Sequence, residues 1–269
     1  MKKDKAGTLS RWRLVFDTFL PTGFGKPLIH AILCCNWPEV SKLAKRSPSM
    51  ARTLFRYQSE DGPIVLLPLH LCLRKSPPVC VVEHLIKAYP LSIRMCEYSE
   101  FPKHNRFYYP MHIACGASGG AIEWEIVEVL LDVFPDAAMI KDRTGRLPLH
   151  HALARNASPK CILTLLESFP WSASVPDING WFPLHTACAM GYSALVIRNL
   201  LQCCPEVMER QCSKKTPYEI AFQRAKVVNE EILELLFVEN KEHKELLRQQ
   251  NRYSMMMVST VPSLGRISI

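Results

Sequence analysis

The sequence repeats one short pattern, and an internal repeat constrains the fold of a chain more than its composition does. The pattern is a proline followed closely by leucine, histidine and a small residue, and its sixth copy is divergent. The copies are PLIHA, PLHLC, PMHIAC, PLHHA, PLHTAC and TPYEIA. The histidines of the first five copies are His30, His70, His112, His150 and His185, and Glu219 takes the corresponding position in the sixth copy. Successive positions are 40, 42, 38, 35 and 34 residues apart. Such spacings indicate an array of similar supersecondary units.

A second pattern follows each copy of the first. It is an apolar, helix-like segment that closes on a proline, as in VEHLIKAYP, VEVLLDVFP, ILTLLESFP, IRNLLQCCP and the weaker VSKLAKRSP. Proline suits the first turn of a helix, where its missing N–H has no helical partner. It also disfavours a helical conformation in the residue before it. Each block therefore predicts a helix that begins at a proline, a loop, a second amphipathic helix and a stop.

Turn signals separate the later blocks. The segments KDRTG, at 141–145, and PDING, at 176–180, each combine an aspartate with a glycine. The aspartate can accept hydrogen bonds from nearby backbone N–H groups, and the glycine tolerates a positive φ. We expect a tight turn at the tip of each of these connections.

The last three blocks resemble ankyrin repeats. One block matches the family pattern at Asp177, Gly180, Pro183, Leu184, His185, Ala187, Gly191, Leu200 and Leu201. The preceding one matches at Asp142, Gly145, Pro148, Leu149, His150, Ala152, Leu165 and Leu166. The resemblance is strong over 104–238 and weaker over 27–103. It implies an all-α fold, an ankyrin-type solenoid of stacked helix pairs with turn or β-hairpin-like fingers.

This resemblance divides the chain into a basic N-terminal cap, six repeats and a tail. The cap is 1–26, the repeats lie near 27–66, 67–108, 109–146, 147–181, 182–215 and 216–250, and the tail, 251–269, is expected to be disordered. Two long insertions, FRYQSEDGPIVL and EYSEFPKHNRFYY, are expected to form extended fingers or loops.

The sequence departs from the family at the helix starts. Ankyrin repeats usually have threonine before the proline, and only Thr216 keeps it here; Leu67, Tyr109, Leu147 and Phe182 occupy the other positions. The loss of a capping side chain costs about 1 kcal/mol per helix. The second helices also end on proline, where the family usually ends on glycine.

Two motifs suggest chemistry, and we interpret both as structural. His185 and Cys188 are spaced like metal ligands, but apolar residues replace the cysteine in other repeats, and a structural zinc site needs four ligands. The GASGG segment, 116–120, resembles a nucleophile elbow, which requires a strand before its serine; here a helix precedes it. We therefore predict no catalytic residue, no metal and no cofactor, and we expect His104 and His151 at the surface.

Cysteine content and hydropathy limit the cellular compartments that we expect for this protein. There are 11 cysteines, an odd number, and no CxxC motif. This favours reduced thiols that pack as small hydrophobic residues in the cytoplasm or nucleus. No run of 18 apolar residues occurs, so no membrane span is expected.

The resemblance implies a binding surface made of finger tips and exposed first-helix positions. In this sequence those positions are basic or apolar, whereas most acids, such as Glu128 and Glu167, lie on or beside the second helices. We therefore predict a basic concave face and a more acidic back. The candidate residues are Arg74, Lys75, Arg106, Tyr108, Arg143, Arg146, Arg155, Trp181, Met190, Lys214, Lys215 and Arg224.

The predicted partner follows from that surface and from the net charge of +8. The leading hypothesis is a monomeric, non-catalytic adaptor whose concave face binds an acidic or mixed apolar-acidic protein segment. Nucleic acid bound by the same basic face is the alternative, and a basic surface that is merely solvated is the third possibility.

Overall fold

The computed structural model describes residues 26–59, 62–99, 108–116, 124–210 and 215–224, together with 232, 235 and 236. Most of the described chain is helical, as the sequence predicts. The predicted cap up to residue 25, the predicted tail, His104 and the serine of GASGG lie outside these residues.

Helices occur in pairs at the predicted positions. The first helices, which we call inner, are α2 (Lys26–Leu33), α4 (Pro68–Leu73), α6 (Pro110–Ala114), α8 (Pro148–Ala154), α10 (Pro183–Met190) and α12 (Pro217–Arg224). The second, or outer, helices are α3 (Trp37–Arg46), α5 (Val79–Ala88), α7 (Trp124–Val133), α9 (Pro159–Ser168) and α11 (Ala194–Cys203). All inner helices after α2 begin at the proline of the repeated pattern, so this prediction is confirmed.

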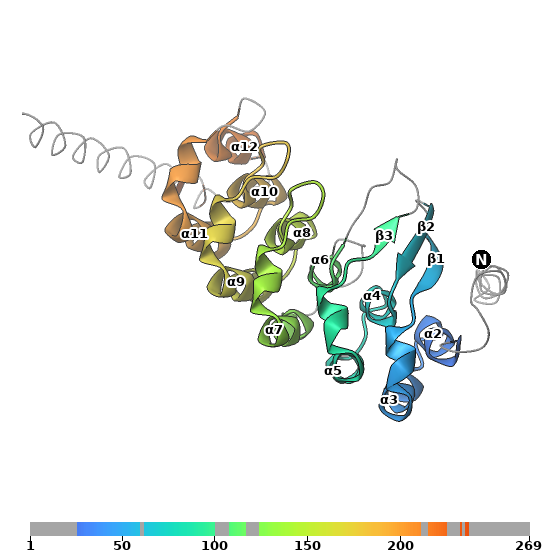
Figure 1. Ribbon diagram of the computed structural model, residues 1–269. Coiled ribbons are helices and arrows are strands. Elements are labelled where there is room, and N and C mark those ends of the chain that lie inside the picture. Colours follow the sequence, from blue (N-terminus) through green and yellow to red (C-terminus); the bar gives the residue numbers. More distant parts are fainter. Residues whose placement is uncertain are drawn as a thin grey trace, which may run out of the picture.

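The pairs pack side by side in the order of the sequence. Each inner helix contacts the inner helix of the next pair, from α2 to α12, and each outer helix contacts the next outer helix, from α3 to α11. Figure 1 shows the resulting row, which runs from α2 and α3 at the lower right to α11 and α12 at the upper left. Contacts therefore connect mainly neighbouring pairs.

Each closing proline does more than end a helix. It begins a short 3-10 helix: η1 (Pro48–Arg52), η2 (Pro90–Arg94), η4 (Pro135–Met139), η5 (Pro170–Ser174) and η6 (Pro205–Glu209). The residue before the proline is extended, as at Phe134 with φ −146° and ψ 82°, because proline disfavours a helical conformation there. The predicted stop is correct, but the sequence interpretation missed the 3-10 helix that follows it.

The first long insertion forms a β-hairpin. Strand β1 (Phe55–Ser59) pairs antiparallel with β2 (Gly62–Leu66), and β3 (Tyr98–Ser99), from the second insertion, pairs with β2. Within the described residues the predicted fingers at this end of the row are thus joined in one three-stranded sheet (Figure 1).

The core lies between the inner and outer helices and continues from pair to pair. Its largest fully buried side chains are mainly leucine and isoleucine, such as Ile32, Leu69 and Leu130. Four cysteines, Cys72, Cys115, Cys161 and Cys188, are also buried. The ten cysteines of the described residues are free thiols, as predicted.

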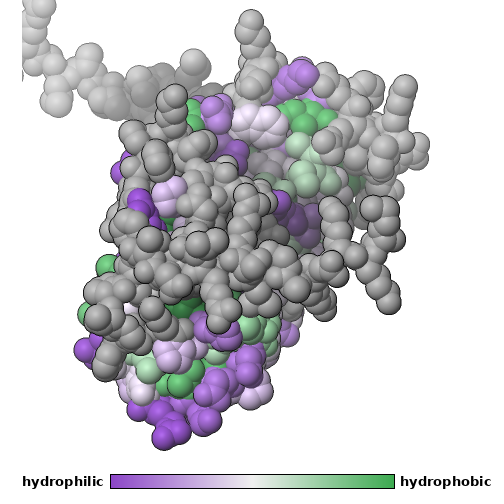
Figure 2. Space-filling view, turned by 90° about the vertical axis from the view of Figure 1, so that its right-hand side faces the viewer, coloured by the Kyte–Doolittle hydropathy of each residue, from purple (hydrophilic) through white to green (hydrophobic). Residues whose placement is uncertain are grey.

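Hydropathy also bears on membrane insertion. Among the helices of the described segments, none combines the length and the apolar character needed to cross a bilayer. Figure 2, a view toward the N-terminal end of the row, shows hydrophilic and hydrophobic residues interspersed at the lower end, where Figure 1 places α3.

Candidate interaction surface

At His70, His150 and His185, the repeated histidine links its helix pair to the segment that follows. At the start of α4, the Leu67 N–H donates to His70 Nδ1 (3.3 Å), and Nε2 of the same ring lies 2.9 Å from the Met95 carbonyl. Since Nδ1 accepts, Nε2 carries the proton and donates. His150 repeats this arrangement with the Leu147 N–H and the Trp181 carbonyl. Both histidines therefore bond to backbone groups on either side of a helix start.

Burial keeps these rings neutral. Loss of hydration lowers the pKa of His70, His112 and His150 to about 4, because the charged imidazolium is the form that burial disfavours. The Nε2 of His112 lies near the carbonyls of Ile140 and Arg146 but makes no hydrogen bond of normal geometry.

The divergent sixth copy caps its helix by a different route. The Thr216 N–H donates to Glu219 Oε2 (2.8 Å), and the Glu219 N–H donates to Thr216 Oγ1 (3.3 Å). This reciprocal pair is a capping box, which satisfies two otherwise unpaired donors at the helix start. Glutamate at this position therefore accepts the backbone N–H at its own helix start, as Nδ1 of His70 and His150 does. It does not supply the second bond, which Nε2 of those histidines makes to a carbonyl further along the chain.

His185 and Cys188, whose spacing suggests a metal site, are packing residues. His185 Nε2 lies 3.0 Å from the Arg210 carbonyl, so the ring is already engaged in the link to the following segment. Burial raises the pKa of the Cys188 thiol to about 12, which disfavours the thiolate that a metal would need. Within the described residues, no cluster of three potential metal ligands occurs.

Two aspartates build the predicted turns at the finger tips. Asp142 Oδ1 accepts from the backbone N–H groups of Thr144 and Arg146, and Asp177 Oδ1 accepts from those of Asn179 and Trp181. The tips also touch one another, because the Ile178 N–H donates to the Thr144 carbonyl (3.0 Å).

Gly145 fits this contact for a steric reason. Its φ is +73°, and a Cβ at this position would lie 3.2 Å from the Ile178 nitrogen. A side chain there would be both strained and crowded.

His151 is buried, and its predicted surface position is wrong. Its Nε2 lies within hydrogen-bond distance, 2.8 Å, of Asp142 Oδ2, and its ring packs edge-on against those of Tyr108 and His112. Burial of Asp142 opposes its ionisation, but hydrogen bonds from His151, Thr144 and Arg146 outweigh this effect and hold its pKa well below the usual range. The pair ties a finger to α8.

The Asp142–His151 pair brings an acid and a base together, and the sequence analysis did not predict this contact. A carboxylate that orients an imidazole is one part of a catalytic triad. Here the ring is only 8 % exposed, and the aromatic rings of neighbouring elements pack against it. The pair is therefore placed to stabilise the fold.

Two of the predicted partner-binding arginines are engaged within the protein. Arg74 Nη2 contacts both carboxylate oxygens of Glu97, whose side chain is 2 % exposed, and Arg146 Nε lies 3.2 Å from Asp177 Oδ2. Arg74 therefore neutralises a buried acid, and Arg146 is half-exposed but paired; that either contacts a partner stays a prediction. Both acids come from fingers, and sequence spacing does not reveal such pairs.

The remaining predicted residues divide into three groups. Arg143, Arg155, Met190 and Lys215 are exposed, and Lys75, Tyr108 and Trp181 are half-buried. Arg106 and Lys214 lie outside the described residues, as does the side chain of Arg224. Ile178, at a finger tip, was not predicted to belong to this surface, although its side chain is 74 % exposed. Its place next to the tip aspartate was the signal for it.

The outer side is not uniformly acidic, and the prediction of a more acidic back does not hold for its first two helices. Lys45 and Arg46 on α3 and Lys87 on α5 are exposed there. Acids predominate on α7, with Glu128 and Asp132 exposed, whereas α9 carries both Glu167 and Lys160, and α11 carries Arg198 but no acid. The charge of the outer helices therefore varies along the row of helix pairs.

Two aromatic residues that precede closing prolines form cation–π contacts with arginines of the preceding helix pair. The Arg52 guanidinium lies 5.5 Å from the centre of the Tyr89 ring, and that of Arg94 lies 4.4 Å from the centre of Phe134. Both arginines are the last residue of a 3-10 helix. These cation–π contacts join consecutive pairs, and the sequence interpretation did not anticipate them.

Comparison with known proteins adds no family assignment. No family model matches the chain, and a search of curated proteins finds no match.

Proposed function

We propose that this chain is an ankyrin-type solenoid and a non-catalytic protein-interaction module. The proposal is supported by the row of helix pairs, the repeated histidine link and the finger turns built on aspartate and glycine. Such arrays present extended surfaces of similar units and commonly bind other macromolecules.

The proposed binding surface lies at the finger tips and the inner helices. It combines cations with apolar side chains: Arg143 and Arg155 are exposed, as are Met190 and Ile178, and Trp181 is half-buried. Arginine and large apolar side chains dominate the energetics of protein interfaces. We propose that this surface binds an acidic or mixed apolar-acidic segment of another protein. The single observation that carries this proposal is the exposure of Ile178 and Met190 beside these cations.

Affinity capture followed by quantitative mass spectrometry tests the proposal. Wild-type protein is compared with a double variant, Arg143→Glu with Ile178→Asp, and with the control Arg198→Glu, which reverses an exposed charge on the outer helix α11. Direct binding is then measured with the recovered partner in purified form. We expect the double variant to lose at least about ten-fold in affinity and the control to retain wild-type affinity. Equal affinities for all three proteins would refute the surface assignment.

Nucleic acid remains the alternative partner, because exposed Arg143, Arg155 and Lys215 could also contact phosphates. A salt titration with a labelled mixed-sequence single strand separates the two hypotheses. Binding to phosphates loses affinity with a logarithmic slope of about −0.7 per neutralised charge. An affinity in the micromolar range or tighter that falls steeply with salt would favour nucleic acid.

A further inference from the structure

One edge of the row carries a charge pattern that neither the fold nor the proposed function requires. We call it the η edge and define it as the last turn of each outer helix with the following 3-10 helix. Its five segments are 43–52, 85–94, 130–139, 165–174 and 200–209. The structure describes all five, so their charges can be compared directly.

The sign of the charge changes once along this edge. The first two segments contain five bases and no acid: Lys45, Arg46, Arg52, Lys87 and Arg94. The other three contain five acids and no base: Asp132, Asp136, Glu167, Glu206 and Glu209. All ten side chains are exposed, which excludes a role for them in the core.

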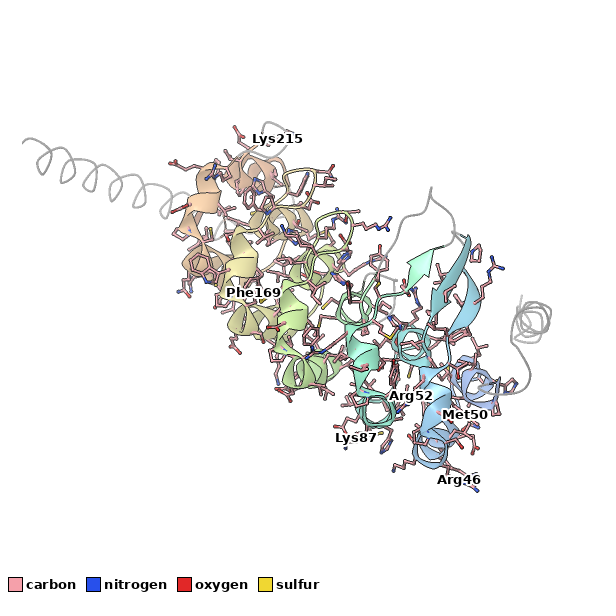
Figure 3. The ribbon with its side chains drawn as sticks, in the orientation of Figure 1. Arg46, Met50, Arg52, Lys87, Phe169 and Lys215 are labelled. Atoms are coloured by element: carbon pink, nitrogen blue, oxygen red, sulfur yellow. The ribbon has the colours of Figure 1, made fainter. Side chains whose placement is uncertain are left out.

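Packing makes the five segments one continuous surface. The 3-10 helices η1, η4 and η5 pack against the next outer helices, α5, α9 and α11 respectively. The stacking of Arg52 on Tyr89 and of Arg94 on Phe134 continues this contact between neighbours. Figure 3 shows the side chains of Arg46, Arg52 and Lys87 at the α3–α5 end of the row, with Phe169 farther along it.

Apolar side chains are exposed in the middle of the same edge. Leu91 is 60 % exposed, Val133 46 %, Met139 50 % and Trp171 72 %. Scattered exposed apolar residues need no explanation, but these four lie in the three consecutive segments where the charge changes sign. The edge is therefore basic in its first two segments and acidic in its last three, with apolar side chains exposed in the second to fourth segments.

The charges of this edge are complementary to those of the same edge on a second copy that runs in the opposite direction. A two-fold axis near η4 places the basic segments of one copy against the last two acidic segments of the other. It also brings Leu91 of one copy toward the segment that holds Trp171 in the other. A two-fold interface uses the same patch on both subunits, so each charge match occurs twice. We propose that two copies of this chain associate antiparallel through their η edges, in place of the monomer expected from sequence.

The charge pattern favours a second copy over other occupants. An anionic membrane would attract the two basic segments but would be repelled by the three acidic ones. A purely acidic peptide would leave the acidic half of the edge unmatched. A second copy matches the two basic segments with the last two acidic ones, and it leaves Asp132 and Asp136 of the middle segment facing the same segment of the other copy.

Sedimentation velocity with charge-reversed variants tests the dimer. A basic-end variant carries Lys45→Glu, Arg46→Glu and Lys87→Glu, and an acidic-end variant carries Asp132→Lys, Glu167→Lys and Glu206→Lys. Wild type is expected to dimerise at low ionic strength and to dissociate as salt screens the charges. Each variant alone is expected to dimerise at least about ten-fold more weakly than wild type.

An equimolar mixture of the two variants provides the decisive measurement. The basic-end variant has a largely acidic edge that keeps Arg52 and Arg94, and the other variant has a largely basic edge, so the mixture is expected to form a heterodimer at least as strong as the wild-type dimer. Arg143→Glu, on a finger, is the control that should dimerise like wild type, and circular dichroism confirms that every variant is folded.

Three outcomes would overturn the proposal. Wild type could sediment as a monomer at high protein concentration and low salt, both variants could dimerise like wild type, or the folded variants could fail to associate when mixed. None of these results tests partner binding at the finger tips and inner helices, so the failure of the dimer proposal would leave the proposed function unaffected.

Discussion

Lowering the pH from 7 to 5 should destabilise this protein strongly, because His70, His112 and His150 are buried in neutral form with a pKa of about 4. An unfolded histidine has a pKa of about 6.5. The unfolded chain therefore binds more protons than the folded one between these two values. The contribution of each ring is fully present above about pH 6.5 and is lost progressively as the pH falls toward 4.

The magnitude follows from proton linkage. At pH 5, an unfolded histidine is about 97 % protonated, whereas a ring with a pKa of 4 is about 10 % protonated. The difference, about 0.9 proton per ring, corresponds to a slope of about 1.2 kcal/mol per pH unit. From pH 7 to pH 5 each ring costs about 2 kcal/mol, so the three together cost roughly 5 to 6 kcal/mol. That is comparable to the whole stability of many domains.

Urea unfolding, followed by circular dichroism between pH 7 and pH 5, measures this dependence. In the variant His150→Gln, the amide can accept from the Leu147 N–H and donate to the Trp181 carbonyl, as the ring does, but it does not titrate. Its free energy of unfolding should depend less steeply on pH, by about 1 kcal/mol per pH unit. Leu149→Val, a change in the adjacent core, should lower stability at every pH and leave the slope unchanged.

Two results would refute this reasoning. One is a wild-type free energy of unfolding that stays constant from pH 7 to pH 5. The other is a His150→Gln variant whose pH dependence matches that of wild type, which would show that the buried ring does not resist protonation.

Three further predictions concern single side chains. Asp142→Asn should destabilise the protein by about 2 kcal/mol in urea unfolding, because the amide offers one acceptor oxygen where the carboxylate accepts from His151 through Oδ2 and from two backbone N–H groups through Oδ1; a loss below about 0.5 kcal/mol would contradict that role. Glu219→Ala should cost about 1 kcal/mol and speed hydrogen exchange at the Thr216 amide, whereas Glu219→Gln should keep most of the capping box. A thiol reagent should label exposed Cys80 in the native state and buried Cys161 only after unfolding, and equal labelling rates would show that Cys161 is accessible.

The positions of the helices follow from the sequence because proline and the apolar period act locally. Pro148 begins α8 and Pro183 begins α10, as local chemistry requires. The 3-10 helices were missed for a local reason as well. A five-residue element after proline has no periodicity of its own, and its signal is only a buried residue two positions later, such as Ala137.

The candidate surface could be predicted only in part, because pairing partners are distant in sequence. Glu97 lies 23 residues from Arg74 and Asp177 lies 31 from Arg146, and nothing in either local pattern reveals the contact. His151 was misplaced for a different reason. The helix α8 is so short, and so enclosed by its neighbours, that it is buried on every side from Pro148 to Leu153. Amphipathic reasoning assigns an outward face that this helix does not have.

The two ways of filling the histidine position suggest how the array can change length. The imidazoles of His70, His150 and His185 reach a carbonyl beyond their own helix pair, so in these units the ring would lack its acceptor without a successor. The carboxylate of Glu219 is satisfied by the Thr216 N–H of its own unit. A few base changes in the gene, from histidine to glutamate with threonine before the proline, would therefore turn an internal unit into one that can stand last.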